Sequence, residues 1–457
     1  MRVDSLGNPV TVTTDAALAA VNDFVEGFLA YETRAADVLA AADADPASAM
    51  LNAYAGMLWL LLESPEGPGR AAPYVAKAHA ARAQAHPREQ AVIDFLLAWF
   101  ENDIGRAETI ADTILAAWPN DLLILKLRQY HAFNRGDFPA MLRAACSVAD
   151  ANADNPRLHG MLAFAYEQCH LLDEAEASAR RALALKRKEP WAQHALAHVM
   201  LTQGRIDEGA AFLEGARDTW TGLNSFMDTH LWWHLALFYL SQGRFDEALA
   251  AYDQHSWTQE KDYSQDQIGA VSLLARLELA GVDVGPRWDD VADHLAKRGE
   301  DVVQPFLTLQ YLYGLARAGR PEAASLLAAV RRMATNAPDF TRAAWRDATL
   351  PAAEGLVAHA HGDFEAAVQG LRTALPRLIE VGGSHAQRDF FDQIALDAVI
   401  RSGRLGEAQQ ALELRRAFDP DGVPLNRTLA EIYERLGLPR EAAKARARVE
   451  RRLAALS

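Results

Sequence analysis

The chain has 457 residues, half of them hydrophobic, with a formal net charge of −15 and a sequence pI of about 5.4. Because this acidic chain lacks a Lys/Arg stripe interleaved with aromatic residues, we do not expect it to bind nucleic acid. Two cysteines, Cys146 and Cys169, argue against a disulfide framework. No apolar run approaches the ~18 residues of a membrane-spanning helix. The opening MRVDSLGNPV lacks the apolar core of a secretory signal, so a cytoplasmic protein without a membrane segment is expected.

Helical periodicity fills the first third of the chain. Thr14 is a candidate N-cap for the first helix. Alternating β-branched residues occur only at 10–14, so the sequence predicts an all-α fold. The expected helices of this region cover residues 14–39, 47–62, 71–85 and 87–99, with a Pro- and Gly-rich loop at 64–69.

A short phrase recurs where two predicted helices meet. Its copies GRIDEGA and GRFDEAL place Ile206 and Phe245 at equivalent positions 39 residues apart, and two later copies place Phe364 and Leu405 41 residues apart. A helical hairpin recurring every ~33–41 residues is typical of a tetratricopeptide-type solenoid. One hairpin cannot bury its apolar face alone, so neighbours stack into a superhelix with a concave inner wall. We therefore predict an all-α helical-hairpin solenoid that is strongly curled around a concave pocket.

One continuous superhelix over residues 1–457 is expected, because each repeat of a solenoid touches only its neighbours. The regularity of the pattern nevertheless changes along the chain. The expected parts are degenerate hairpins over 14–155, regular repeats over 156–254, looser repeats over 255–380, and a Gly-rich loop with C-terminal capping repeats over 381–457.

The turn glycines allow the inner face of each first helix to be predicted. Residues 13, 10, 6 and 3 before the turn share one face, because a helix repeats every 3.6 residues. His194 and His198 lie ten and six before Gly204, His230 lies 13 before the next turn glycine, and His234 follows at the edge of that face. Imidazoles one turn apart can share a Zn²⁺ or similar ion, which makes all four candidate metal ligands. Alternatively, they bond within the helix stack or form a polar pocket floor. No HExxH motif is present, which excludes a zincin.

Three other side chains are expected on the same inner face. Glu167 lies three residues before His170, which occupies the turn position of its hairpin, and is a candidate catalytic carboxylate. Trp233 and His359 lie ten and three residues before their turn glycines, and both are candidate ligand-binding residues.

The segment GGSHAQRD combines a Gly-rich loop with the start of a helix, where an anion is favoured. Ser384 and Gln387 have capping-box spacing, although Gln387 is also a candidate ligand-binding residue. Arg388 offers a bidentate fork to a carboxylate. His385 and Asp389 stand one turn apart, so a hydrogen bond between them would make His385 a general base and both of them catalytic.

Longer motifs resemble a known family. They are WAQHALAHVMLTQGRIDEGAAFLE at 191–214, HLWWHLALFYLSQGRFDEALAAYD at 230–253, GGSHAQRDFFDQIALDA at 382–398 and VDVGPRW at 282–288. With these stretches the chain resembles the tetratricopeptide repeat protein 38 family nearly end to end. The resemblance implies a soluble, intracellular, all-helical repeat protein and supplies no reaction.

Two functions remain open. The first is binding of a small carboxylate-bearing ligand, or of a peptide segment, in the concave pocket. The second is an enzyme, of metal-dependent hydrolase type, that uses the histidines together with His385, Arg388 and Asp389. Since polar residues gather in two stretches some 150 residues apart in sequence, we expect His385 or Arg388 to lie within ~10 Å of the middle histidines. The sequence leaves oligomerisation open.

Overall fold

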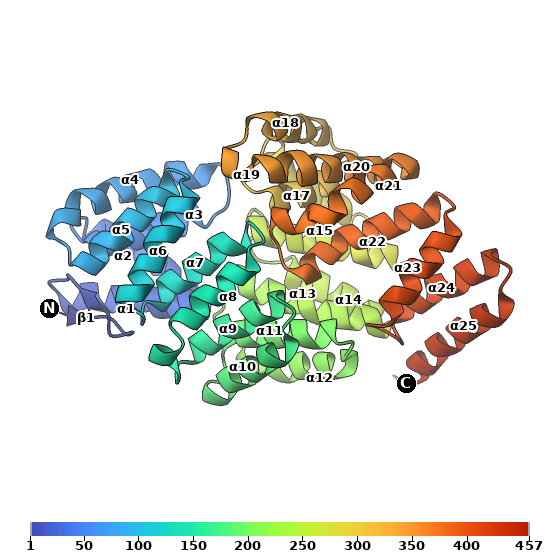
Figure 1. Cartoon of the computed structure of the whole chain (residues 1–457), viewed down its shortest axis with the longest axis horizontal. Helices are drawn as coiled ribbons and strands as arrows, with labels where there is room; N and C mark the ends of the chain where they lie inside the picture. The colour runs from blue at the N-terminus through green and yellow to red at the C-terminus, as the bar shows by residue number, and fades with distance from the viewer. Residues whose placement is uncertain (1, 456–457) are drawn as a thin grey trace. The chain divides into compact units, whose positions relative to one another are not determined.

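The computed structural model describes residues 2–455 (Figure 1). Its helices form two compact units. The first unit comprises the chain up to Leu196 together with Asp218–Met227, and the second comprises Ala197–Arg217 together with the chain from Asp228 onward. Three elements cross this division, namely α11 (Pro190–Thr202), η4 (Arg217–Thr219) and α13 (Ser225–Gln242).

The first unit consists of consecutive helical pairs. They are preceded by an antiparallel ribbon of two strands with two residues each. Helices α3 and α4, α5 and α6, α7 and α8, and α9 and α10 pack against each other in turn. The elements are β1 (Arg2–Val3), β2 (Pro9–Val10), α1 (Asp15–Ala30), η1 (Thr33–Asp37), α2 (Val38–Ala44), α3 (Ala49–Leu60), α4 (Glu66–Ala81), η2 (Arg82–Gln84), α5 (Pro87–Phe100), α6 (Ile104–Ala117), α7 (Leu122–Phe133), α8 (Phe138–Ser147), η3 (Asp150–Asn152), α9 (Pro156–Gln168) and α10 (Leu172–Leu185).

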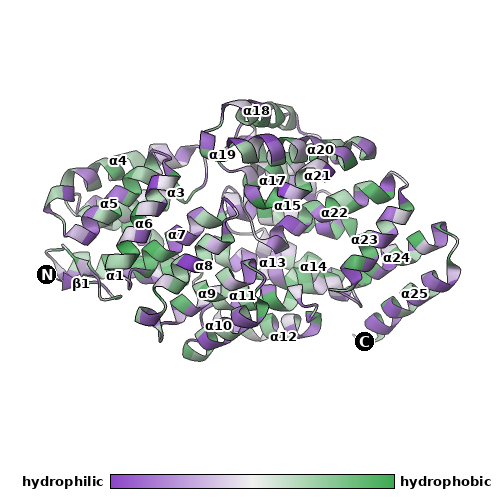
Figure 2. Ribbon diagram, in the orientation of Figure 1, coloured by the Kyte–Doolittle hydropathy of each residue, from purple (hydrophilic) through white to green (hydrophobic). Residues whose placement is uncertain are grey.

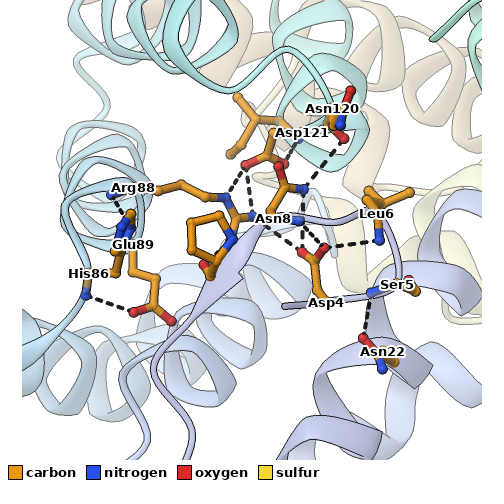
Figure 3. A network of polar contacts seen from close by, with 12 residues as sticks. Asp4, Ser5, Leu6, Asn8, Asn22, His86, Arg88, Glu89, Asn120 and Asp121 are labelled. Atoms are coloured by element: carbon orange, nitrogen blue, oxygen red, sulfur yellow. Dashed lines mark hydrogen bonds and ion pairs between the residues drawn. The ribbon is translucent and has the colours of Figure 1, made fainter. Parts of the chain in front are cut away.

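A buried ion network fixes the N-terminal ribbon in the first unit (Figure 3). Arg88, at the start of α5, lies 2.8 Å from Asp121 and 3.7 Å from Asp4, and it also donates to the carbonyl of Pro9. Arg88 is 1% exposed. Because each charge has an opposite charge within the network, the cost of burying it is offset.

The second unit continues the hairpin architecture. Helices α20 and α21, and α24 and α25, pack as consecutive pairs, while α15 packs against both α17 and α22. The elements are α12 (Ile206–Ala216), α14 (Phe245–Ala251), η5 (Tyr252–Ser256), α15 (Ser264–Leu279), α16 (Arg287–Leu295), η6 (Ala296–Arg298), α17 (Pro305–Arg317), α18 (Glu322–Asn336), α19 (Asp339–Ala344), η7 (Trp345–Thr349), α20 (Leu350–Ala360), α21 (Phe364–Ala374), η8 (Leu375–Val381), α22 (His385–Arg401), α23 (Leu405–Arg416), α24 (Val423–Arg435) and α25 (Pro439–Ala454).

The turn glycines of the repeats have the backbone conformation that their sequence position demands. Gly204 and Gly243 have φ of 69° and 79°, a region that favours glycine. A Cβ on Gly204 would also lie 2.1 Å from the carbonyl oxygen of Phe418, and one on Gly243 would lie 2.9 Å from the side chain of Val423. These glycines therefore both end a helix and admit a neighbouring segment.

The predicted all-α hairpin fold is confirmed, and its helices show hydrophobic and hydrophilic residues alternating along their length (Figure 2). Thr14 caps α1 by accepting from the backbone of Ala17. Among residues 2–455, no helix has the length and apolarity needed to cross a bilayer. The prediction of one continuous superhelix over residues 1–457 concerns how the two units adjoin, and it stays a prediction.

Two predicted boundaries are wrong. The first helix was expected to reach Leu39, but α1 ends at Ala30 because Tyr31 adopts a left-handed conformation with φ of 57°. The predicted loop at 64–69 is helical from Glu66 onward. Pro68 is tolerated there because it stands in the first turn, where a backbone N–H has no helical acceptor in any case.

Candidate functional site

Three histidines converge in the second unit. His198 comes from α11, while His230 and His234 come from α13. The ring centroids of His198 and His234 are 4.5 Å apart, and those of His230 and His234 are 4.7 Å apart. His198 and His234 are fully buried, and His230 is 9% exposed. The three residues form what we call the histidine cluster.

His385 joins this cluster from the first turn of α22. Its ring centroid lies 5.4 Å from that of His198, and its Nε2 is 3.5 Å from the Thr202 hydroxyl oxygen. The expectation that a residue of the Gly-rich segment approaches the middle histidines is confirmed. Residues separated by 187 positions in the sequence (385 minus 198) therefore meet in one unit.

His194 and Glu167 belong to the first unit. His194 lies one helical turn before His198 on α11, and its ring stacks on Trp191 with centroids 4.6 Å apart. Glu167 is fully buried and accepts a hydrogen bond of 2.6 Å from the side chain of Gln168. Their roles as a metal ligand and a catalytic carboxylate stay predictions.

The electrostatic setting favours a neutral imidazole at His230. Burial and, to a smaller extent, the neighbouring His198 lower the pKa of this side chain to about 3. A neutral imidazole is the form that binds a metal ion or accepts a hydrogen bond. His230 therefore offers an uncharged nitrogen at neutral pH.

The distances between the ring nitrogens of the cluster are close to those found in a metal site. Each histidine offers a ring nitrogen within 4.8 Å of those of the other two. Two nitrogens bound to one zinc ion at ~2.1 Å in a tetrahedral arrangement would lie roughly 3.4 Å apart. Rotation of the rings would therefore have to bring the nitrogens together by at most about 1.4 Å on binding.

A residue that sequence patterns did not identify lies against Trp233, which itself stacks on His230. Arg276, on α15, is 5% exposed. Its Nη1 donates to the carbonyl and the hydroxyl of Ser272, and its Nη2 donates to the carbonyl of Ala386 at 2.9 Å. The guanidinium carbon lies 5.4 Å from the ring centroid of Trp233. The cation therefore adjoins both α13 and the start of α22.

Arg276 has no carboxylate of its own among the described residues. The nearest charge influence is that of Asp389, whose carboxylate lies 2.7 Å from Arg415 and accepts from Gln393. Burial lowers the pKa of Arg276 to about 10, although Asp389 opposes that shift. The side chain thus stays cationic at neutral pH, bonded only to uncharged acceptors.

Trp233 forms an internal wall beside the cluster and not the side of an open groove. It is 1% exposed, and its indole lies nearly parallel to the His230 ring, at an interplanar angle of 7° and a centroid distance of 5.2 Å. Its buried Nε1 meets no acceptor within the part of the chain that the structure describes. A buried indole N–H ordinarily finds an acceptor, so this donor is a distinctive feature of the site.

Most of the polar side chains in the Gly-rich segment form hydrogen bonds within the segment itself. The predicted capping box between Ser384 and Gln387 is confirmed. Arg388 donates to the carbonyl of Gly383. The expected hydrogen bond between His385 and Asp389 is not formed, because the Asp389 carboxylate bonds to Arg415 and Gln393. Asp389 therefore does not orient His385 as the enzymatic alternative required.

His359 belongs to a separate polar chain in the second unit. Its Nε2 lies 2.8 Å from Asp397, and its Nδ1 lies 3.3 Å from the Tyr313 hydroxyl. Both ring nitrogens are therefore engaged by side chains. These contacts connect α17, α20 and α22, and the ligand-binding role of His359 stays a prediction.

One sequence signal could have identified Arg276. The stretch IGAVSLLARLEL at 268–279 is apolar on almost every face, which is typical of a fully buried helix. An arginine in the middle of such a helix is therefore a candidate for a buried charge. The turn-based reasoning did not reach it, because the repeat phrase is absent from this part of the chain.

Comparison with known proteins supports the repeat assignment. A family model of the tetratricopeptide repeat matches residues 229–254, which span most of α13 and all of α14. The human IFIT1 dimer with m7Gppp-AAAA is 13% identical over 97% of this chain and 96% of that one, with a TM-score of 0.44. The APC/C hetero-tetramer Cut9–Hcn1 is 13% identical over 96% and 90%, with a TM-score of 0.38. At such low values these likenesses carry no argument about ligands. The narrower resemblance to the tetratricopeptide repeat protein 38 family stays a resemblance.

Proposed function

We propose that this tetratricopeptide-repeat chain binds a small carboxylate-bearing ligand beside the histidine cluster of its second unit. The observation that carries the proposal is the convergence of His198, His230 and His234 from two repeat helices, with ring nitrogens within 4.8 Å of one another. Small-molecule sites are mostly apolar and contain a few convergent polar groups. The cluster and its aromatic surroundings have this character.

The chemistry of the site favours a small ligand over a long peptide. Trp233 and the three histidines are almost entirely buried, whereas a peptide groove needs an extended accessible wall. The indole N–H of Trp233 and the Arg276 guanidinium beside it are donors, which suits an anionic group on the ligand. An amino-acid or acyl derivative would satisfy both conditions.

In the stronger form of the proposal the cluster also holds a divalent transition metal such as zinc. His198, His230 and His234 would supply the ring nitrogens. Three nitrogens with an open position would let the metal receive the carboxylate directly.

Cobalt(II) titration tests the metal-bound form, because tetrahedral cobalt absorbs visible light. We expect one equivalent to bind to the wild type and His230→Gln to weaken binding by about tenfold or more, the order of magnitude for loss of one ligand. His294→Gln is the matched control, since His294 lies elsewhere in the second unit and bonds to Asp262. Equal affinity in both variants would place the metal elsewhere.

Titration calorimetry with acetate, butyrate, N-acetylalanine and succinate tests the carboxylate-binding form, with and without added zinc. We expect at least one of these probes to bind to the wild type and to bind more weakly to His198→Gln. Failure of every probe to bind, under both conditions, would contradict the proposal.

A further inference from the structure

We propose that Arg276 is the anchor for the ligand's carboxylate and that the indole N–H of Trp233 is the second donor to it, so that the site selects small monocarboxylates. This inference rests on the proposed function and names the residues and the ligand class that complete it. Neither residue was among those that sequence motifs assigned to an anion.

First, the buried Arg276 guanidinium has more N–H donors than acceptors around it. A guanidinium has five N–H donors, and those of Arg276 meet at most three acceptors among residues 2–455, all of them uncharged. Burying an unpaired charge is costly, and buried cations normally have a carboxylate beside them. Arg276 lacks one, so the protein keeps a charge whose counter-ion must come from outside these contacts.

The second argument is independent and concerns Trp233. Its Nε1 is buried and donates to no described residue. The Arg276 guanidinium lies over the same ring, 5.4 Å from its centroid. Two donors with unused capacity, one charged and one neutral, therefore adjoin each other. A carboxylate has two oxygens that can accept from both.

The third argument concerns how Arg276 is held. Ser272 lies one turn before it on α15 and accepts twice from Nη1, while the Ala386 carbonyl of α22 accepts from Nη2. These contacts fix the guanidinium before any ligand arrives. A pre-positioned donor fork reduces the entropy cost of binding, and its planar geometry matches a carboxylate.

The ligand class follows from the charge. Asp389 is paired with Arg415, which leaves the Arg276 guanidinium without a carboxylate of its own. One negative charge would neutralise it, whereas a second charge on the ligand would be buried without a partner. Phe390 and Trp233 both lie within 6 Å of the guanidinium carbon, at 5.9 and 5.4 Å from their ring centroids. An apolar tail on the acid is therefore favoured.

Calorimetric titration tests this assignment with butyrate, phenylacetate, succinate, inorganic phosphate and the uncharged amide butyramide. We expect the two monocarboxylates to bind more tightly than succinate or phosphate, and butyramide to show no heat of binding. Arg276→Met should weaken monocarboxylate binding by about 10- to 100-fold, as expected for loss of a charged hydrogen-bonding group. Arg320→Met is the control, because Arg320 pairs with Asp293 elsewhere in the second unit.

Two further variants separate the contributions of the positive charge, the planar fork and the indole N–H. Arg276→Lys retains the charge but loses the fork, so it should recover only part of the affinity. Trp233→Phe keeps a ring while removing the N–H, and we expect a loss of about fivefold, the order of one neutral hydrogen bond. If the wild type binds monocarboxylates and neither Arg276→Met nor Trp233→Phe weakens binding, this inference is wrong while the proposed function stands. If the wild type binds none of the probes, the proposed function fails as well.

Discussion

Two buried arginines in this chain have opposite surroundings. Arg88 in the first unit is 1% exposed and lies within 4 Å of two carboxylates, Asp121 and Asp4 (Figure 3). Arg276 in the second unit is 5% exposed and contacts only carbonyl and hydroxyl oxygens. The comparison teaches that burial alone does not define the role of a charge. A cation with counter-ions in the fold stabilises the fold, whereas one without them is available to a ligand.

The pKa values of the two side chains follow this difference. Burial lowers the pKa of Arg88, but Asp121 and its neighbours more than reverse the effect and raise it above the ordinary value. For Arg276 the effect of burial is not reversed, and the pKa falls to about 10. The first arginine is thus electrostatically compensated, and the second is not.

The largest expected effect comes from breaking the compensated network. Asp121→Ala removes the partner of Arg88 and also the N-cap of α7, where Asp121 accepts from Ile124. We expect a loss of about 3–5 kcal/mol in the free energy of unfolding, because the buried Arg88 loses its nearer carboxylate and keeps only Asp4, 3.7 Å away. Urea unfolding followed by circular dichroism measures it.

Asp94→Ala is the matched control for that experiment. Asp94 forms a two-bonded pair with Arg82 in the same unit, but both side chains are about one-third exposed. We expect a loss below about 1 kcal/mol, as for other surface pairs. Equal losses in the two variants would contradict a special role for burial.

Lowering the pH should reduce the stability of the folded chain through the buried His230. The pKa of His230 in the folded chain, about 3, lies below the ordinary histidine value of 6.5 that applies to the unfolded chain. As the pH falls below 6.5, the unfolded chain takes up a proton that the folded chain does not. Stability is therefore lost between pH 6.5 and 3, by about 2 kcal/mol from pH 7 to pH 5 for one such group. Urea unfolding at both pH values should show a smaller loss for His230→Gln than for the wild type. An unchanged loss would refute this assignment.

A smaller effect is expected at Asp389. Burial raises its pKa, but Arg415, Arg276 and the bond from Gln393 lower it to about 2, below the ordinary value of 3.8. Its contribution to stability is present above pH 3.8 and is lost as the pH falls through 2. Because the side chain is one-third exposed, we discount the effect for solvent screening and expect Asp389→Asn to cost about 1–2 kcal/mol at pH 7. The variant should also lose less stability than the wild type between pH 4 and pH 2.

The smallest predicted effects compare one helix cap in each unit. Thr14 caps α1, and Ser384 caps α22 within a capping box. Replacing either residue with Ala should cost about 1 kcal/mol, measured by thermal unfolding. Only Ser384→Ala should also weaken monocarboxylate binding, because α22 carries the Ala386 carbonyl that holds Arg276. Equal ligand affinity in the two variants would show that this support is dispensable.

The repeat pattern was sufficient to predict the hairpins and much of the cluster. Positions counted back from Gly204 and its successor identified His198 and His230 as inward-facing, because helical periodicity makes such a count reliable within one hairpin. Ser384 followed from capping-box spacing. These are local properties, and local properties can be read from sequence.

The features that the sequence did not predict depend on contacts between distant segments. Whether Asp389 bonds to His385 or to Arg415 depends on where α23 lies, which no local spacing reveals. That Arg276 contacts only uncharged acceptors depends on how α15 lies beside Trp233 of α13 and Ala386 of α22. The break at Tyr31 depends on its left-handed backbone, which a tyrosine seldom adopts.

A side-by-side measurement of unfolding free energies for Arg88→Met and Arg276→Met tests the central claim most directly. The account predicts that Arg88→Met loses about 3–5 kcal/mol, because two buried carboxylates are left without their cation. Arg276→Met should stay within about 1 kcal/mol of the wild type or exceed it, since an uncompensated buried charge is replaced by an apolar side chain of similar length. A loss for Arg276→Met as large as that for Arg88→Met would show that both arginines serve the fold, and would contradict the account.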